Sequence, residues 1–272
     1  MRPRPGPATI PGSPTPLSSP PVSPPAVHRQ LGLLPCARMD SVTIDSRFNG
    51  PDGSANGGYA CGLVAGLMSG DATVRLRAKP PLDTPLSVVR TDEGVELHDG
   101  DTFVAQGLAS TATWEEIPAP PSLEEARAAQ ERYTGFHAHV FPRCFVCGPE
   151  REAGDGLRLF AGPVEDRPMA ACTWSPGSGV LTPDGTVDPV FVWAALDCPS
   201  FFGLKVPYDK LFLLAEMSAK LERPVPGNEP LIVYGWGRST EGRKHYAGAA
   251  IATAEGTVLA HAQHLWIEAR PG

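Results

Sequence analysis

The segment "SANGGYACGLVAGLM", residues 54–68, places the strongest constraint on what this chain can fold into. A helix at a protein surface carries one polar and one apolar face. Residues 59–68 are apolar or small throughout, so a helix formed from them has no polar face. We therefore predict a helix near residues 57–68 that is wrapped by protein on every side. The segment "VDPVFVWAALDCPSFFGL" has the same character and predicts a second buried helix near residues 189–198.

The start of the first helix has the features of a binding site. Asn56 is a good N-cap residue, because its side-chain oxygen can accept a hydrogen bond from an early helical N–H group. Gly57 and Gly58 would then form the first turn, where a ligand can approach bare backbone donors closely. The sequence thus predicts a buried central helix whose N-terminus faces a site.

Composition excludes several classes of protein. The chain has 272 residues, of which 42% are hydrophobic and 19% charged, a balance typical of soluble globular proteins. The formal net charge of −7 argues against a nucleic-acid-binding surface. No apolar run reaches the ~20 residues that a membrane-spanning helix needs. Six cysteines in a chain of this length do not indicate a disulfide scaffold, so we expect reduced thiols and a cytoplasmic protein.

The Pro-rich N-terminal segment is set apart from the rest. It holds Pro, Ser and Gly with almost no large apolar residues, which predicts disorder, and it lacks the apolar core of a signal peptide. An equally good reading is that translation begins at Met39. We divide the chain into a disordered tail (1–38), an N-terminal unit (39–117), a linker with a connector helix (118–136) and a C-terminal unit (137–272).

The two units repeat one plan. The segment "RAKPPLDTPLSVV" parallels "LERPVPGNEPLIVY", and "GDTFVAQG" parallels "EGTVLAHA". A period of about 140 residues is too long for a solenoid and fits a duplicated domain. In each unit, alternating β-branched segments surround the buried helix, and "GLRLFAGPV" is also expected to be a strand. Between the units, Ser122 and Glu125 have the spacing of a capping box and predict the start of a surface connector helix.

These features resemble the hotdog fold of the acyl-CoA thioesterase superfamily, over roughly residues 40–270. The segment "CFVCGPEREAGDGLRLF" is similar to the opening of hotdog proteins related to phenylacetate-pathway thioesterases. "AALDCPSFFG" looks like the helix that ends in a catalytic acid, and "ERPVPGNEPLIVYGWG" like a long strand after a Pro-containing turn. The resemblance implies an α+β tandem (double) hotdog: two long antiparallel sheets, each wrapped around a buried central helix, joined into one β-layer.

The resemblance also implies a split site. The family has a His-Gly-Gly stretch at the start of the helix and an acidic residue nine positions after the His. The first unit carries Asn56 with two glycines, but Ala65 at the acid position. The second unit carries Asp197 at the acid position, but Asp188 and Pro189 in place of the glycine turn. One composite site between the halves would combine the glycine turn with Asp197, and the other would be inactive.

In this composite site we expect two catalytic residues, Asp197 and Asn56. Asp197 would be the general base or the nucleophile, and the sequence does not choose between these roles. Asn56 would orient the water or the carbonyl. The N–H groups of a helix start stabilise the charge that develops on a thioester carbonyl, so Gly57, Gly58 and Tyr59 are the predicted substrate-binding residues.

Each of these residues also has a purely structural interpretation. Asn56 and Asp188 can act simply as N-caps, the latter with Pro189 at the favoured first helical position. Asp197 is harder to explain without a partner, because it lies in an apolar segment. Pro199 can end the helix there, in which case the Asp197 carboxylate would bond loop amides.

The cysteines allow a metal site but do not require one. Cys144 and Cys147 form a C-x-x-C pair with His137 and His139 just upstream, and these could nominally supply four zinc ligands. The hotdog relatives carry "CFVCG" without metal, so packing and a tight turn are the preferred explanation and we expect no metal. Cys198 is a weaker candidate nucleophile, since no His lies near it in sequence. His261 and His264 are read as strand residues.

The leading functional hypothesis is hydrolysis of an acyl-CoA or acyl-carrier thioester without a cofactor. A non-catalytic acyl-CoA-binding or regulatory protein is the alternative, and it is favoured by the incomplete motif in each half. A hydratase or dehydratase would need a His close to the acid and ranks third. We expect no nucleic-acid or membrane partner. Acyl-chain preference, pathway and further homodimerisation are not readable from the sequence.

Overall fold

A computed structural model describes residues 1–2, 40–204, 206 and 210–270. The chain divides into two units, Met1–Arg38 and Met39–Gly272. Only residues 1–2 of the first unit are described, so the predicted disorder of the N-terminal tail lies outside the described residues. Everything that follows concerns the second unit.

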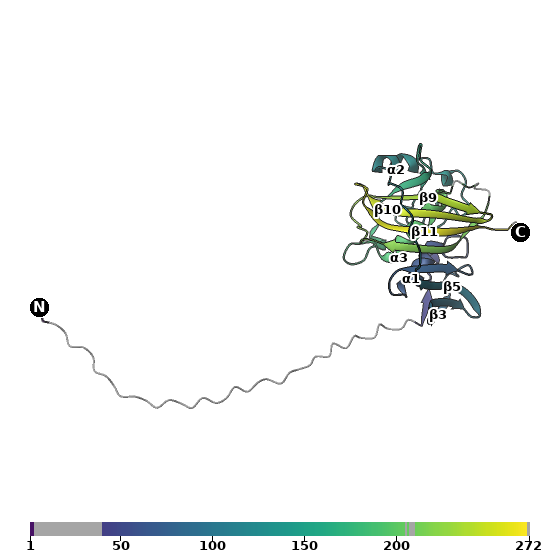
Figure 1. Cartoon of the computed structure of the whole chain (residues 1–272), viewed down its shortest axis with the longest axis horizontal. Coiled ribbons are helices and arrows are strands. Elements are labelled where there is room, and N and C mark those ends of the chain that lie inside the picture. The colour runs from purple at the N-terminus through teal and green to yellow at the C-terminus, as the bar shows by residue number, and fades with distance from the viewer. Residues whose placement is uncertain (3–39, 205, 207–209, 271–272) are drawn as a thin grey trace, which may run out of the picture. The chain divides into compact units, whose positions relative to one another are not determined.

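Within the described residues, the second unit is built on one eleven-stranded antiparallel sheet, in the order β1-β3-β4-β5-β2-β8-β11-β10-β9-β7-β6. In Figure 1, β10 lies between β9 and β11. With its few helices, this is an α+β fold. The strands are β1 (Ser41–Thr43), β2 (Ala72–Leu76), β3 (Pro85–Arg90), β4 (Gly94–Asp99), β5 (Thr102–Ala109), β6 (Gly162–Pro163), β7 (Met169–Trp174), β8 (Phe212–Leu221), β9 (Leu231–Glu241), β10 (Lys244–Thr253) and β11 (Val258–Glu268).

The strand order is mirrored about the centre of the sheet. Outward from the centre, one half runs β2, β5, β4, β3, β1 and the other β8, β11, β10, β9, β7, with the short β6 as an additional edge strand. The halves meet where β2 pairs with β8, from Ala72 opposite Ala219 to Arg75 opposite Glu216. The Arg75 Nε atom lies 2.5 Å from Glu216 Oε2, so an ion pair accompanies this junction. The two sheets expected from the sequence therefore form one continuous layer.

The two predicted buried helices are present. They are α1 (Gly57–Gly66) and α3 (Pro189–Phe202), and most of their residues are buried. Glycines let them pack closely: a Cβ atom on Gly58 would lie 2.5 Å from Asp197 Cβ, and one on Gly62 would lie 2.9 Å from Trp193 Cβ. Only residues without a side chain allow backbones to approach this closely. Gly58 and Gly62 thus serve the packing of the two helices.

Pro199 does not end the second helix. The helix α3 continues through Pro199 to Phe202, and Gly203 is its C-cap. A proline in a helix interior removes one hydrogen bond and usually kinks or breaks the helix. Here Pro199 is buried together with Cys198 and Ser200, so tertiary packing outweighs that cost. The Asp197 side chain is therefore held on a continuous helix, one turn before its end.

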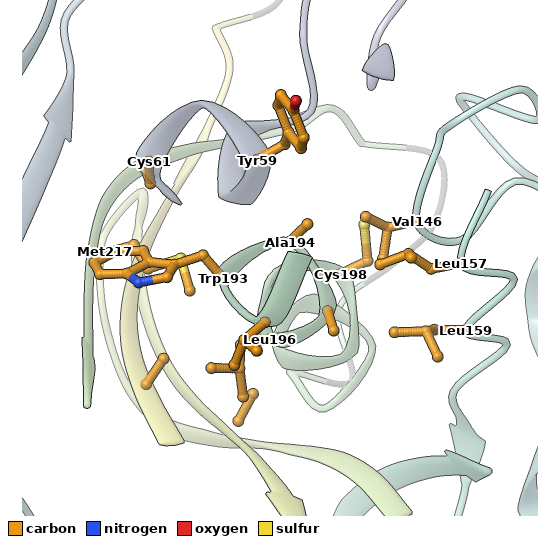
Figure 2. Close-up of a cluster of buried hydrophobic side chains, with 14 of the residues drawn as sticks. Tyr59, Cys61, Val146, Leu157, Leu159, Trp193, Ala194, Leu196, Cys198 and Met217 are labelled. Carbon is orange, nitrogen blue, oxygen red and sulfur yellow. The ribbon is translucent and has the colours of Figure 1, made fainter. Parts of the chain in front are cut away.

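The core lies around the two helices. Side chains leave α3 in several directions: Ala194 toward α1, Leu196 toward the strands, and Cys198 toward Val146 (Figure 2). Each of these four residues is no more than 7% exposed. This all-round burial is the physical reason that the segment has no polar face.

A third helix, α2 (Leu123–Gln130), covers a different face of the sheet. The predicted capping box is present, since Glu125 N donates to Ser122 Oγ (3.1 Å) and Ser122 N donates to Glu125 Oε2 (2.6 Å). Two buried alanines of α2 pack against alternate residues of β9 and β10, in a cluster separate from the main core. These strands are covered on both faces, which explains the apolar runs "LIVYGWG" and "AGAAIAT".

Short elements complete the fold. They are the 3₁₀ turns η1 (Ser46–Phe48), η2 (Thr134–Phe136) and η3 (Ser178–Val180). The predicted strand "GLRLFAGPV" is a strand only at Gly162–Pro163. Gly156 and Arg158 have positive φ angles of 101° and 54°, which are incompatible with an extended strand. No helix in the described part of the chain is long and apolar enough to cross a membrane.

Candidate active site

A cavity of about 400 Å³ opens beside the N-terminus of α1. Its lining comes from both halves of the described chain. The first half contributes residues 50–51, 54–57 and 76–80, and the second contributes residues 138–141, 144, 147, 197–198, 201–202, 210–215 and 266–267. A cavity of this size fits the usual range for small-molecule sites. The predicted residues Asn56, Gly57 and Asp197 all line it.

Asn56 connects the two helices. It is the N-cap of α1, and its Oδ1 atom accepts from the Tyr59 N–H (2.9 Å). Its Nδ2 atom donates to Asp197 Oδ2 at 2.8 Å. One amide side chain thus satisfies a helix terminus with its oxygen and a carboxylate with its nitrogen. The structural and functional interpretations of Asn56 are therefore compatible.

Asp197 is a buried carboxylate, 2% exposed. Its Oδ2 atom accepts from Asn56 Nδ2 and from the Gly58 N–H (2.9 Å). Its Oδ1 atom is buried and has no hydrogen-bond partner among the described residues. Burial raises the pKa of Asp197 to about 7, because the charged form loses water, although the two donors oppose this shift. One oxygen is thus fixed and the other is left unpaired.

The predicted carbonyl-binding donors need correction. The N–H groups of Gly58 and Tyr59 are already bonded to Asp197 and Asn56. Neither is available to a ligand in this arrangement. The Gly57 N–H, by contrast, makes no hydrogen bond within the described residues, and Gly57 lines the cavity. Of the three predicted substrate-binding residues, only Gly57 therefore has an available backbone donor in this arrangement.

Tyr59 does not line the cavity as predicted. Its ring stacks on Phe48 (centroids 4.1 Å apart) and approaches Phe145 and Phe191 at 6.2 and 5.7 Å. These rings form an aromatic cluster between α1, α3 and the loop that carries Cys144. Tyr59 is thus a packing residue whose backbone N–H donates to the N-cap side chain of Asn56.

Three cysteines meet in the wall of the cavity. The sulfur atoms of Cys144, Cys147 and Cys198 all lie within 4.8 Å of one another. All three are free thiols and buried. Cys147 Sγ lies 3.3 Å from His139 Nε2, and Cys144 Sγ lies 3.8 Å from Cys198 Sγ. The sequence showed the C-x-x-C pair, but its association with Cys198, 51 positions further on, had no sequence signal.

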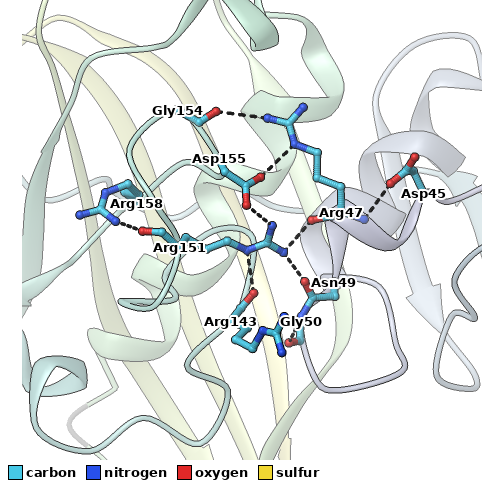
Figure 3. Close-up of polar contacts among 9 residues, drawn as sticks. All are labelled: Asp45, Arg47, Asn49, Gly50, Arg143, Arg151, Gly154, Asp155 and Arg158. Carbon is cyan, nitrogen blue, oxygen red and sulfur yellow. Dashed lines mark hydrogen bonds and ion pairs between the residues drawn. The ribbon is translucent and has the colours of Figure 1, made fainter.

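A polar network holds the loop of Cys144 against the segment that leads into α1 (Figure 3). Arg151 is at its centre: it donates to Asp155 (2.8 Å), to the Arg47 carbonyl (2.7 Å) and to Asn49 Oδ1. A backbone bond from Phe145 N to Asn49 O (2.7 Å) reinforces it. The relative positions of Asn56 and the cysteines thus follow from contacts outside the cavity.

Asp188 has the structural role that the sequence favoured. Its side chain accepts from the Val190 N–H (3.0 Å) as the N-cap of α3, with Pro189 at the first helical position. It is not among the residues that line the cavity. The two aspartates of α3 therefore lie in different environments, one at the helix start and one in the cavity wall.

Aromatic side chains that were not singled out from the sequence form another part of the cavity wall. They are Phe201, Phe202, Phe212 and Trp266. Trp266 also donates through Nε1 to Ser200 Oγ (2.9 Å), which in turn donates to the Asp197 carbonyl (2.7 Å). This chain of bonds orients the last turn of α3. Most of the lining is apolar, and its polar side chains are Asn56, Asp197, the three thiols, Ser54, His139, Arg77, Lys79 and Lys210.

Comparisons with known proteins support the fold. A protein assigned as a candidate thioesterase II from Thermobifida fusca matches with a TM-score of 0.57 and 16% identity, over 85% of this chain and 93% of that one. The tesB protein of Mycobacterium avium subspecies paratuberculosis matches with a TM-score of 0.51 and 12% identity, over 81% and 90%. No protein-family profile and no curated protein sequence matches the chain.

The chain has the fold of hotdog thioesterase-like proteins, because these matches span most of both chains. The hotdog resemblance inferred from the sequence is thereby confirmed at the level of fold. Identities of 12% and 16% carry nothing about reaction or substrate. Those follow only from the chemistry of the cavity.

Proposed function

We propose that the chain hydrolyses an acyl-CoA or acyl-carrier thioester, with one composite site between two fused hotdog halves. The mirrored strand order and the equivalent positions of α1 and α3 support the tandem arrangement. The observation that carries the activity is the Asp197 carboxylate: it is buried in the cavity wall, with one oxygen held by two donors and the other unpaired.

In the proposed reaction, Asp197 is the general base. A water molecule beside Oδ1 attacks the thioester carbonyl and gives its proton to Asp197. The carbonyl oxygen becomes negative and accepts from the Gly57 N–H, where the helix dipole adds to the stabilisation. The tetrahedral intermediate then collapses, the C–S bond breaks, and the proton passes to the leaving thiolate. The products are a carboxylic acid and a free thiol.

Asn56 is a positioning residue in this scheme. Its Nδ2 atom and the Gly58 N–H fix the orientation of the carboxylate by holding Oδ2. The orientation of the unpaired Oδ1 atom is therefore set before the reaction begins. No rearrangement of the carboxylate is needed in the transition state, which is the usual advantage of a preorganised site. The substrate arm would lie along the cavity between residues of the two halves.

A non-catalytic acyl-CoA-binding protein is the second candidate. It is favoured by the bonds that already occupy the Gly58 and Tyr59 N–H groups, which leave a single backbone donor for the carbonyl. Such a protein would bind a thioester in the same cavity and release it unchanged. Its binding would not depend on the Asp197 charge.

Thiol release from a panel of short, long and aromatic acyl-CoAs tests the proposal. Loss of a general base lowers the rate by roughly 10²- to 10⁴-fold, and this is the expected effect of Asp197→Asn. The matched control is Asp188→Asn, which keeps an equally good N-cap on the same helix and should leave the rate unchanged. Full activity in Asp197→Asn would refute the mechanism. Binding without turnover in the wild type would establish the second candidate.

A further inference from the structure

Three buried thiols meet in the cavity wall, and the proposed hydrolysis uses none of them. Cys144 and Cys147 come from one loop and Cys198 from α3, with exposures of 3%, 4% and 7%. Their sulfur atoms lie within 4.8 Å of one another. A tight turn after the C-x-x-C pair explains why Cys144 and Cys147 lie close together. It does not explain why Cys198, from a different element, lies beside them.

The spacing matches the requirements of a thiophilic metal ion. In a tetrahedral site with Zn–S bonds of about 2.3 Å, the sulfur atoms are about 3.8 Å apart. Cys144 Sγ and Cys198 Sγ are 3.8 Å apart. Cys147 Sγ needs to move by less than ~1 Å to complete the same geometry around the ion. A side-chain rotation of this size needs no change in the backbone.

Each sulfur atom also has an N–H donor beside it. Asn56 Nδ2 lies 3.9 Å from Cys144 Sγ and 3.8 Å from Cys198 Sγ. His139 Nε2 lies 3.3 Å from Cys147 Sγ. Donors of this kind stabilise thiolates and are the usual second layer around a thiolate-bound metal.

His139 is assigned to this second layer and not to the ligands. Its Nδ1 atom accepts from the Phe141 N–H at 2.9 Å. In a neutral imidazole the other nitrogen then carries the hydrogen, so Nε2 donates to Cys147. The geometry therefore favours a ligand set other than the two cysteines and two histidines that the sequence could nominally supply.

We infer that Cys144, Cys147 and Cys198 bind one thiophilic metal ion, of the Zn²⁺ or Cu⁺ class, in the wall of the cavity. Zn²⁺ would take the three thiolates and one further ligand from the cavity side, whereas Cu⁺ is satisfied by soft sulfur ligands alone. Binding releases the thiol protons to solvent, since the thiolate is the ligand. This revises the expectation of no metal, because the sequence could not place Cys198 beside the pair.

The test is elemental analysis of the full chain, purified without chelator and then dialysed against Zn²⁺ or, under reducing conditions, Cu⁺. We expect about one ion per chain in the wild type. Cys198→Ala should lose it, and His139→Gln should lower the affinity by roughly 10- to 100-fold. The control is Cys172→Ala, which removes a buried thiol of β7 outside the cluster and should retain the ion.

A second measurement covers the case in which a variant does not fold. Chelator-treated wild type is titrated with Co²⁺, whose thiolate charge-transfer absorption reports sulfur ligation directly. Saturation at about one ion with this absorption supports the site. Three results would overturn it: no ion in the wild type, equal occupancy in Cys198→Ala, or a Cys144–Cys198 disulfide in the protein under reducing conditions. None of these readouts depends on hydrolytic activity.

Discussion

Gly58 is where the two central helices approach most closely, and replacing it with Ala is a direct test of that packing. The new Cβ atom would lie 2.5 Å from Asp197 Cβ and 2.8 Å from the Trp193 carbonyl oxygen. Carbon atoms pack best at about 3.5–4.0 Å, so the helices must separate locally by ~1 Å. The backbone oxygen cannot rotate away as the tip of a flexible side chain could.

Two opposing terms determine the size of the effect. Overpacking a well-packed core costs about 1–3 kcal/mol. Replacing Gly by Ala in a helix contributes about 0.8–1.0 kcal/mol in the favourable direction. We therefore expect Gly58→Ala to lower the free energy of unfolding by up to ~2 kcal/mol. It should also weaken the bond from Gly58 N to Asp197 and so reduce hydrolysis.

Gly66→Ala is the matched control. Gly66 is the last residue of α1, and a Cβ atom there would meet no atom within 4 Å. Only the propensity term applies, so this variant should gain up to ~1 kcal/mol. Urea unfolding followed by tryptophan fluorescence and circular dichroism gives both values. If Gly58→Ala proves as stable as Gly66→Ala, the close packing of α1 on α3 is wrong.

Two further predictions concern the sheet. Burial lowers the pKa of His264 to about 3. As the pH falls below 6.5, His264 is protonated in the unfolded chain but stays neutral in the folded one. The free energy of unfolding therefore decreases from about pH 6.5 toward pH 3. Between pH 7 and pH 5 the wild type should lose about 2 kcal/mol more than His264→Phe in urea unfolding, and equal losses would contradict the shift. Glu216→Gln removes the ion pair with Arg75 at the β2–β8 junction. The Glu216 side chain is 32% exposed and the Arg75 side chain 42%. Because the pair is partly solvated, the cost in the same assay should be below ~1 kcal/mol, and a larger loss would show that the charge pair holds the halves together.

The sequence was most informative where a single physical requirement dominates. Helices without a polar face have to be buried, and this gave the positions of α1 and α3. The contact between Asn56 and Asp197 was predictable from the resemblance to hotdog thioesterases, because each half kept a different part of the family's motif.

Prediction failed where neighbouring groups compete. The Gly58 and Tyr59 N–H groups were expected to face a ligand, but Asp197 and Asn56 accept them instead. Pro199 was a candidate helix end, but burial on α3 outweighs the lost bond. The partnership of Cys198 with the C-x-x-C pair depends on how a loop lies across a helix, and no local pattern encodes it.

The junction at β2 and β8 has a consequence for how this protein can change. In a symmetric assembly of identical chains, every substitution appears twice, and a mutation that improves one site alters its copy as well. Here α1 and α3 hold equivalent places in one continuous polypeptide, so each position occurs once. Asn56 with its glycines precedes one helix, and Asp188 with Pro189 precedes the other. A substitution at either end of the helix pair therefore changes that end alone: the Asn56 end lines the cavity, whereas Asp188 only caps its helix.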